Sequence, residues 1–217
     1  MTIWNKQQQA LFHRETTGDE VVAQYFINGT RVYGTFADAF AYSKFIMTDP
    51  DGDTTNELLY DACHTHFDLD SKLTLEELGF TTVLEFTDKF TEFLHCCFKD
   101  YLGEDIPLRN FLWSTSTRPG KTSFHITVVS DHKFWRKVQK NDDLKTFAKL
   151  VESDSYNHNG FYYLVDTKDE ISLTSLVDTA IYSKNRCFRS LGSRKIESDV
   201  KFQPLENGVV VPTTERL

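Results

Sequence analysis

The sequence predicts a mixed α and β fold, in which strands with one polar face are separated by amphipathic helices. Three stretches support this prediction: an Asn28-Gly29 turn between two apolar runs, a helical pattern of aromatic residues over 73–103, and a strictly alternating strand over 122–128. The chain has 217 residues, of which 40% are hydrophobic and 18 are Phe. It is therefore long enough to bury a substantial aromatic core.

The N-terminal part is expected to contain a helix or an extended lead-in over 1–16, followed by a β-hairpin over 21–34 at the Asn-Gly pair. Aromatic residues at helical spacing over 36–47 predict a helix that begins at Thr35. The acidic stretch 49–53 resembles a calcium loop. Its glycine, however, falls inside the third acidic pair rather than after it, so we expect a turn here.

The central strand is expected within 58–69. Together with the next residue, Asp70, it presents two carboxylates on one face. Because side chains alternate along a strand, Asp68 and Asp70 point the same way, together with His64 and His66. Two carboxylates this close repel each other, and a divalent cation relieves the repulsion. A solvated acidic face explains the short D-x-D pattern equally well when it is taken alone.

A second polar strand is expected downstream of the long helix, which ends at Gly103. A turn that contains Lys121 leads into this strand, where Ser123 and His125 share one face with Thr127. A single histidine on a strand is more often structural than catalytic. This histidine shares its face with a hydroxyl group and follows a turn lysine, which favours a functional role.

The C-terminal third is expected to hold a helix from Asp131 to about 151, then strands over 160–165 and 171–177, the second ending at Asp178. A dense basic segment follows, and the last residues, 202–217, are expected to be loop. The basic side chains of the segment are Lys184, Arg186, Arg189, Arg194, Lys195 and Lys201. They form either a solvated face or a clamp for a polyphosphate.

Composition narrows the class of protein. The net charge is −8, from 24 basic and 32 acidic residues, so any nucleic-acid contact must come from a local basic patch. The four cysteines form no C-x-x-C pair, so no structural zinc site is expected, and the pattern is typical of a reducing, intracellular protein, cytoplasmic or nuclear. The N-terminus lacks the apolar region of a signal peptide, and no apolar run approaches the roughly 18 residues of a membrane span.

Three carboxylates, a Ser-x-His strand and a late basic cluster favour phosphoryl transfer, since metal ions held by carboxylates activate an attacking oxygen and cations neutralise the phosphates. Two other classes of site remain open. A metal oxygenase would use His64, His66 and a carboxylate as a facial triad, which leaves Lys121 and the arginines without a role. A nuclease would use two carboxylates and a histidine, but does not need a triphosphate cradle.

Three segments in this order resemble the motifs of the archaeo-eukaryotic primase superfamily: Phe67-Asp68-Leu69-Asp70, Lys121-Thr122-Ser123-Phe124-His125, and Val177-Asp178-Thr179-Ala180-Ile181-Tyr182 continuing to Arg186, Arg189 and Lys195. The likeness is to the PrimPol branch and to the primase domain of poxvirus-type and other large DNA virus primase-helicases. It runs from about Leu11 to Lys195, and the third motif is its most specific part.

The resemblance implies an α+β, two-layer fold in which a modified RRM-like catalytic sheet lies beside an N-terminal αβ module. The whole chain, 1–217, would then be one primase-polymerase catalytic domain, with the N-terminal module over about 1–60, the catalytic module over about 61–200 and a tail over 201–217. The implied activity is template-dependent DNA priming or polymerisation from nucleoside or deoxynucleoside triphosphates on single-stranded DNA. It would serve replication, with a viral replication site among the locations that the resemblance implies.

The family's functional residues map onto this chain as follows. Asp68, Asp70 and Asp178 would bind two catalytic Mg²⁺ or Mn²⁺ ions. Ser123 and His125 would contact the phosphates of the incoming nucleotide, and His125 would act with the carboxylates in catalysis. The rest of the triphosphate cradle would be Lys121, Arg186, Arg189 and Lys195. Arg31 resembles an arginine that lies against the incoming nucleotide or the template.

Two departures from the family pattern affect these expectations. Asp70 stands where PrimPol has Glu, which keeps the charge on a shorter side chain. The Cys/His zinc module that is associated with starting primers has no candidate here. We therefore expect a partner helicase or a C-terminal zinc or helicase domain outside this chain, and primer extension more than de novo priming. The alternative is a catalytically silent relative that binds single-stranded nucleic acid. Asp166, in Val165-Asp166-Thr167, is a rival to Asp178 as the third metal ligand.

Overall fold

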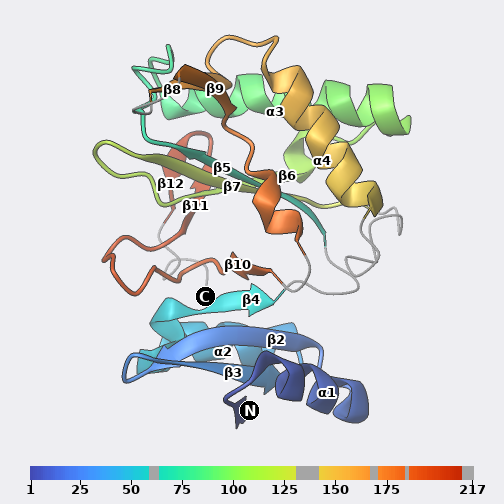
Figure 1. Ribbon diagram of the computed structural model, residues 1–217, viewed down its shortest axis with the longest axis vertical. Coiled ribbons are helices and arrows are strands. Elements are labelled where there is room, and N and C mark those ends of the chain that lie inside the picture. The colour runs from blue at the N-terminus through green and yellow to red at the C-terminus, as the bar shows by residue number, and fades with distance from the viewer. Residues whose placement is uncertain (59–63, 131–141, 167–170, 184–185, 212–217) are drawn as a thin grey trace. The chain divides into compact units, whose positions relative to one another are not determined.

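The computed structural model describes residues 1–58, 64–130, 142–166, 171–183 and 186–211 (Figure 1). The predicted fold class is confirmed at the level of a mixed α+β protein: the described residues form four α-helices and antiparallel sheets. The chain divides into two compact units. The first consists of Met1–Tyr60 and Ser183–Phe202, and the second of Asp61–Tyr182 and Gln203–Leu217. Residues 183–200 are thus part of the first unit, whereas the resemblance implied that they belong to the catalytic module.

The first unit is built on a five-stranded sheet in the order β1-β3-β2-β4-β10. Its strands are β1 (Thr2–Trp4), β2 (Val21–Ile27), β3 (Thr30–Phe36), β4 (Asn56–Leu58) and β10 (Cys187–Arg189). Two α-helices, α1 (Gln7–Thr17) and α2 (Ala39–Thr48), and the 3-10 helix η1 (Pro50–Thr54) complete it.

The predicted hairpin is confirmed, and its turn residues explain it. Asn28 and Gly29 have φ angles of 49° and 75°, the left-handed conformations that a two-residue hairpin turn requires. The predicted start of the following helix at Thr35 is wrong, because β3 continues through Phe36. The helix begins instead at Ala39, where the side chain of Asp38 accepts a hydrogen bond from the backbone N–H of Ala41 at 2.7 Å.

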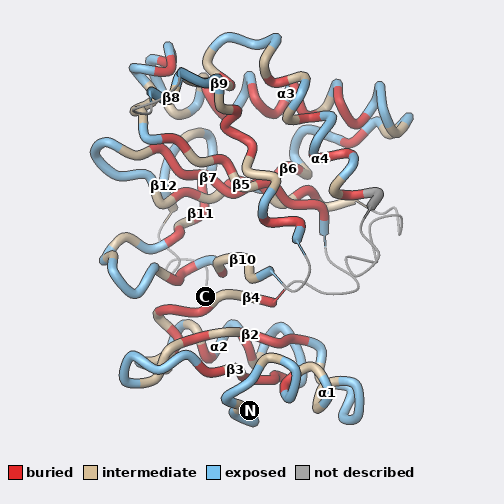
Figure 2. The backbone as a smooth tube through the Cα atoms, viewed as in Figure 1, coloured by how far each residue is buried: buried red, intermediate tan, exposed pale blue. Residues whose placement is uncertain are grey.

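Buried stretches of the first unit lie on β2, β3 and α2 (Figure 2). The larger core cluster packs α2 against the sheet, and a smaller one, made of Ala10, Val22 and Leu58, packs α1 against it. The ring of Phe45 packs 5.0 Å from Tyr25 and 5.2 Å from Phe36, measured between ring centroids. Gly52 closes this end of the core: a Cβ atom there would lie 2.3 Å from the carbonyl oxygen of Phe45. The acidic stretch, predicted to be a turn, therefore forms the 3-10 helix η1, which packs tightly against α2.

The second unit is built on another five-stranded sheet, in the order β12-β11-β6-β7-β5, and a two-stranded sheet of β8 and β9. The strands are β5 (Thr65–Ser71), β6 (Phe111–Thr115), β7 (Thr122–Val128), β8 (Tyr162–Asp166), β9 (Ile171–Ser175), β11 (Gln203–Glu206) and β12 (Val209–Val210). Its helices are α3 (Val83–Leu102), α4 (Asp142–Ser155), η2 (Leu108–Asn110) and η5 (Thr179–Tyr182).

Both long helices of the second unit cover the same face of its larger sheet (Figure 1). Phe86 of α3 packs 5.1 Å from Phe124 of β7, and Phe147 of α4 packs 6.3 Å from Phe67 of β5. These rings are almost completely buried. Because side chains alternate, burying Phe67 and Phe124 under the helices turns the intervening polar residues of β5 and β7 toward the opposite face.

Two predictions for the second unit are wrong in their boundaries. The long helix does not start at 73 but at Val83, where Thr82 caps it, and it ends at Gly103 as predicted. The tail is not loop alone, because 203–206 and 209–210 form a hairpin on β6. Its turn is again Asn-Gly, with φ angles of 51° at Asn207 and 74° at Gly208. The predicted cap at Asp131 lies outside the described residues. Among the described helices, none is long and apolar enough to cross a membrane.

Candidate functional site

The pairing of β5 with β7 brings four of the predicted site residues together. In the antiparallel register, Asp68 lies directly opposite His125 and Asp70 lies opposite Ser123. Directly opposite residues share a face of the sheet, with Cβ atoms roughly 4.5–5.5 Å apart. The two motifs, which lie far apart in the sequence, are therefore one continuous polar surface on the face away from α3 and α4.

Asp178 joins this surface from the other side of β5. The segment after β9 makes an antiparallel bridge between Val177 and Leu69, and the backbone N–H of Asp178 donates to the carbonyl oxygen of Asp68 at 2.9 Å. This pairing places Asp178 opposite Asp68. His125, Asp68 and Asp178 consequently form one row across three neighbouring segments, and Asp70 lies two residues farther along β5. We call these four residues the carboxylate row.

A lysine and a histidine lie next to the carboxylates of Asp70 and Asp68. The ammonium group of Lys121 lies 2.9 Å from Oδ2 of Asp70, and the other carboxylate oxygen, Oδ1, is buried without a hydrogen-bond partner in the described part of the chain. Nε2 of His125 lies 3.5 Å from Oδ1 of Asp68, an ion pair only when the imidazole is protonated. His125 and Ser123 are both buried, so packing fixes their positions.

Two contacts anchor the turn after Asp178, one within the turn and one to β5. Oδ1 of Asp178 accepts a hydrogen bond from the backbone N–H of Ala180 at 2.8 Å, which starts η5. The hydroxyl of Tyr182 then donates to the carbonyl oxygen of His66, and the two rings stack with centroids 5.6 Å apart. Burial lowers the pKa of His66 to about 4, so this imidazole is neutral at physiological pH. His66 thus has a packing role in the structure.

The donor chemistry of the carboxylate row fits a divalent cation. Carboxylate oxygens are the protein ligands that Mg²⁺ and Mn²⁺ prefer, and Asp70 has an oxygen that no described group occupies. In the described residues, no three Asp, Glu, His or Cys side chains are already arranged as a metal-binding group. A cation bound here would therefore have to draw the side chains of the row together.

The four remaining predicted site residues, Arg31, Arg186, Arg189 and Lys195, belong to the first unit. Arg31 is exposed, with its guanidinium 5.8 Å from the ring centre of Phe26. The guanidinium of Arg189 lies 4.8 Å from the ring centre of Phe202, whereas Arg186 and Lys195 are exposed. The third motif therefore divides between the units, with its acid in the second and its basic residues in the first.

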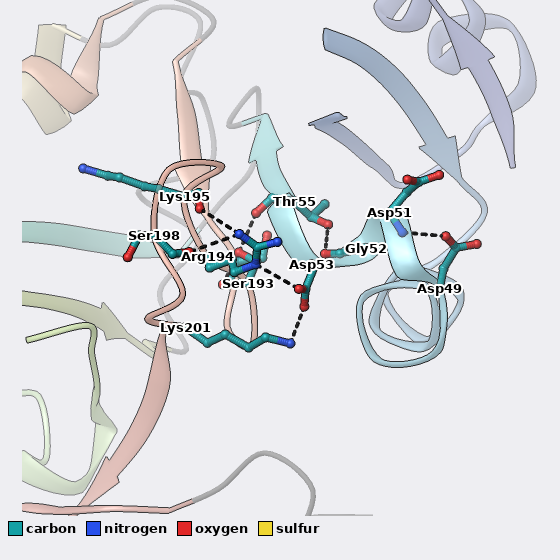
Figure 3. A network of polar contacts seen from close by, with 11 residues as sticks. Asp49, Asp51, Gly52, Asp53, Thr55, Ser193, Arg194, Lys195, Ser198 and Lys201 are labelled. Carbon is teal, nitrogen blue, oxygen red and sulfur yellow. Dashed lines mark hydrogen bonds and ion pairs between the residues drawn. The ribbon is translucent and has the colours of Figure 1, made fainter. Parts of the chain in front are cut away.

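Other basic residues of the late cluster have a structural role (Figure 3). Nε of Arg194 donates to Asp53 at 2.9 Å, and Lys201 pairs with the other oxygen of the same carboxylate. Burial raises the pKa of Asp53, but the hydrogen bonds from Lys201 and Arg194 outweigh this effect and lower it. Asp53 thus ties the segment after β10 to η1, and the dense basic stretch is not one uniform phosphate-binding surface.

The rival ligand Asp166 lies elsewhere in the second unit. It is exposed at the end of β8, where it pairs with Ile171 in the two-stranded sheet. The structure therefore places Asp178 beside Asp68 and Asp166 in a different sheet, although both occur in a Val-Asp-Thr sequence.

A cleft of about 670 Å³ beside the carboxylate row contains residues that the sequence analysis did not single out. Its lining includes Asp70 and Asp178 together with Lys145 and Lys149 of α4 and two aromatic side chains, Tyr156 and Tyr163. The available signal was the spacing of the two lysines, four residues apart on a predicted helix. Lysines at this spacing are common on solvent-exposed helices, so the spacing alone does not identify Lys145 and Lys149 as binding residues.

No protein-family model matches the chain, and no curated protein has a similar sequence.

Proposed function

We propose that the protein is a template-dependent DNA primase or polymerase with an archaeo-eukaryotic primase fold. The reaction would transfer a nucleotide from a nucleoside or deoxynucleoside triphosphate to a primer 3′-hydroxyl or an initiating nucleotide on single-stranded DNA. The observation that supports this proposal most strongly is the carboxylate row, because three acidic residues from two separate motifs meet next to a histidine.

In this proposal Asp68, Asp70 and Asp178 hold two Mg²⁺ or Mn²⁺ ions. The ions would supply charge stabilisation at the attacking and leaving oxygens of the displacement. The side chains of the row orient them: Asp68 and Asp178 are fixed opposite each other by the backbone hydrogen bond between their segments. A 3′-oxygen bonds to the α-phosphorus, the bond from that phosphorus to the bridging oxygen breaks, pyrophosphate leaves and the hydroxyl proton passes to solvent.

The neighbours of the row would bind the incoming nucleotide. Ser123 and His125 would donate to its phosphate oxygens, and Lys121, which lies 2.9 Å from Asp70, would also contact the triphosphate. Arg186, Arg189 and Lys195, which the resemblance assigns to the cradle, belong to the first unit, as does Arg31, which it assigns to the nucleotide or the template. A helicase, or a zinc or helicase domain outside this chain, would deliver the single strand.

The competing function is a silent domain that only binds single-stranded nucleic acid. A patch of three carboxylates only weakens binding to a phosphate backbone, and it gains a clear role when it holds metal ions. The carboxylate row is therefore easier to explain in an enzyme that binds metal ions than in a passive binding domain.

The test is incorporation of a labelled nucleotide on single-stranded DNA with Mn²⁺ or Mg²⁺, with and without an annealed primer. We expect products from the wild type and none from Asp68→Ala or Asp178→Ala. Asp166→Ala is the matched control, since the same three-residue sequence surrounds Asp166 outside the row. Products without a primer would identify a primase in its own right. Absence of products while DNA remains bound would reject the enzyme and favour the silent domain.

A further inference from the structure

The cleft beside the carboxylate row combines features that one kind of ligand requires together. Three acids, two lysines and two tyrosines line it, along with residues 173–177, Thr179 and Ala180; the acids are Asp70, Asp178 and, on α4, Glu152. A volume of about 670 Å³ is within the range of pockets that hold ligands larger than a metal ion. The basic and aromatic groups of the cleft fit a ligand that carries phosphates and planar rings.

The two lysines of the cleft have no carboxylate partner among the residues that the structure describes, although Asp70, Asp178 and Glu152 line the same space. Lys145 and Lys149 are one turn apart on α4, so their Cβ atoms lie about 5–6 Å from each other on one face of the helix. Two flexible ammonium groups at this separation can each contact one of two neighbouring phosphates in a strand.

The tyrosines supply the aromatic part of the cleft. Tyr163 is half-buried on β8, and its pKa is raised first by burial and then by the charges of Asp70 and Asp178. Tyr163 lines the same cleft as both carboxylates. The hydroxyl of Tyr156 accepts a hydrogen bond from the backbone N–H of Ser175 at 3.2 Å, which holds its ring beside β9. Tyrosine rings are suitable platforms for stacking nucleic-acid bases.

The cleft also lies on a different side of the acids from the residues of β7. Ser123 and His125 face Asp70 and Asp68 across one edge of β5, whereas Asp178 and the cleft lie beyond its other edge, and neither residue of β7 lines the cleft. In an in-line displacement, the attacking oxygen approaches the reacting phosphorus from the side opposite to the leaving pyrophosphate. If the triphosphate lies over β7, the strand with the attacking hydroxyl must approach from the side of the cleft.

We propose that this cleft binds the nucleic-acid strand whose 3′-hydroxyl attacks. Lys145 and Lys149 contact consecutive backbone phosphates, and the rings of Tyr156 and Tyr163 lie against the terminal bases. The role of this strand as the attacking one rests on the proposed polymerase function, but its binding in the cleft does not require turnover.

The test is fluorescence anisotropy of a labelled single-stranded oligonucleotide, titrated at several salt concentrations without metal ions or nucleotide. We expect the double variant Lys145→Ala/Lys149→Ala to bind roughly tenfold more weakly at low salt, and the slope of log affinity against log salt to decrease by about 1.4, since each lost phosphate contact accounts for about 0.7. The matched control is Lys89→Ala/Lys99→Ala on α3, which removes the same charge from exposed positions. Lys145→Arg/Lys149→Arg should bind like the wild type.

Tyr163 gives a second measurement that does not depend on the lysine variants. Tyr163→Ala should weaken binding of the oligonucleotide roughly tenfold, and Tyr163→Phe should not, because the phenyl ring still stacks. An unchanged salt slope in the double alanine variant would overturn the proposal. So would loss of nucleoside triphosphate binding with strand affinity retained, which would assign the cleft to the nucleotide. If lysine-dependent strand binding is found but no variant or condition gives incorporation, the proposed function fails and the cleft remains a strand-binding site.

Discussion

Asp53 of the first unit and the acids of the carboxylate row in the second unit have opposite kinds of neighbours. In the first unit, Asp53 is bound by both Arg194 and Lys201, and its pKa is lowered (Figure 3). In the second unit, the carboxylate row places acids next to one another, with a lysine on Asp70 and a histidine on Asp68. An acid that holds a fold together is placed among cations, whereas acids that are placed against each other cost stability unless a ligand neutralises them.

The comparison separates a carboxylate that is paired with two cations, Asp53, from carboxylates that lie next to one another in the row. Both sites bring together residues far apart in the sequence, since Asp53 meets a segment about 140 residues later and Asp68 meets one about 110 residues later. Only the row, however, combines neighbouring carboxylates, an oxygen without a described partner and an adjoining cleft.

The largest expected effect is on activity at the row. Asp68→Asn removes one charge at nearly constant volume, so nucleotide incorporation should fall at least about 100-fold, as for loss of a group that stabilises transition-state charge. The melting temperature should stay the same or rise slightly, because repulsion within the row decreases. Steady-state incorporation and thermal unfolding measure the two quantities. A large fall in stability with activity retained would make Asp68 a structural acid like Asp53.

A smaller effect is expected at the histidine opposite Asp68. His125→Ala should raise the KM for nucleotide roughly tenfold and change the affinity for DNA much less, since the imidazole would contact the phosphates of the nucleotide. His125→Gln, which keeps a hydrogen-bond donor, should recover part of the loss. Equal losses of nucleotide and DNA binding, accompanied by unfolding, would show that the buried ring only supports the sheet.

Asp53→Asn should reverse the pattern of the row, with lower stability and unchanged chemistry. Loss of two partly exposed ion pairs should decrease the free energy of unfolding by about 1–2 kcal/mol at pH 7. Because the pKa of Asp53 is lowered in the folded state, its contribution is present above the ordinary carboxyl value of 3.8 and is lost as the pH falls through the lower folded-state value. Urea unfolding of both proteins at pH 7 and at pH 3 checks this: the difference should narrow at pH 3, and a constant difference would contradict it.

The smallest expected effect on stability is at Lys121. Its ion pair with Asp70 is partly exposed, so Lys121→Met should change the free energy of unfolding by less than about 1 kcal/mol. The KM for nucleotide should nevertheless rise, because the triphosphate loses a cation. Arg118→Met, in the same turn, is the control for general charge loss. Equal effects of the two variants on the KM would remove Lys121 from the proposed cradle.

Local patterns predicted the parts of the fold that depend on neighbouring residues. The Asn28-Gly29 hairpin is confirmed because its two turn residues have intrinsic access to left-handed conformations. The same signal at Asn207-Gly208 was overlooked, because Pro204 and Pro212 made the tail resemble loop. The start of α3 was misplaced because Leu75 and Leu78 continue the apolar pattern of the helix into a turn before Thr82.

The candidate site could be predicted as residues but not as an arrangement. Alternation on two strands was sufficient to put Asp68 with Asp70 and Ser123 with His125, yet only the register makes them directly opposite. The position of Asp178 depends on a bridge at Val177 that no local pattern encodes. Lys145 and Lys149 were missed for the same reason: they become notable only when α4 borders the acids.

Paramagnetic broadening by Mn²⁺ in NMR spectra of the 25.1 kDa protein would test the comparison most directly, because it locates bound metal residue by residue. At low Mn²⁺ concentration, we expect the backbone signals of Asp68, Asp178 and His125 to broaden selectively, and those around Asp53 to stay sharp. The selective broadening should disappear in Asp68→Asn and persist in Asp53→Asn. Broadening that is absent from the row, or that is as strong around Asp53, would contradict the assignment of the row as the metal-binding site.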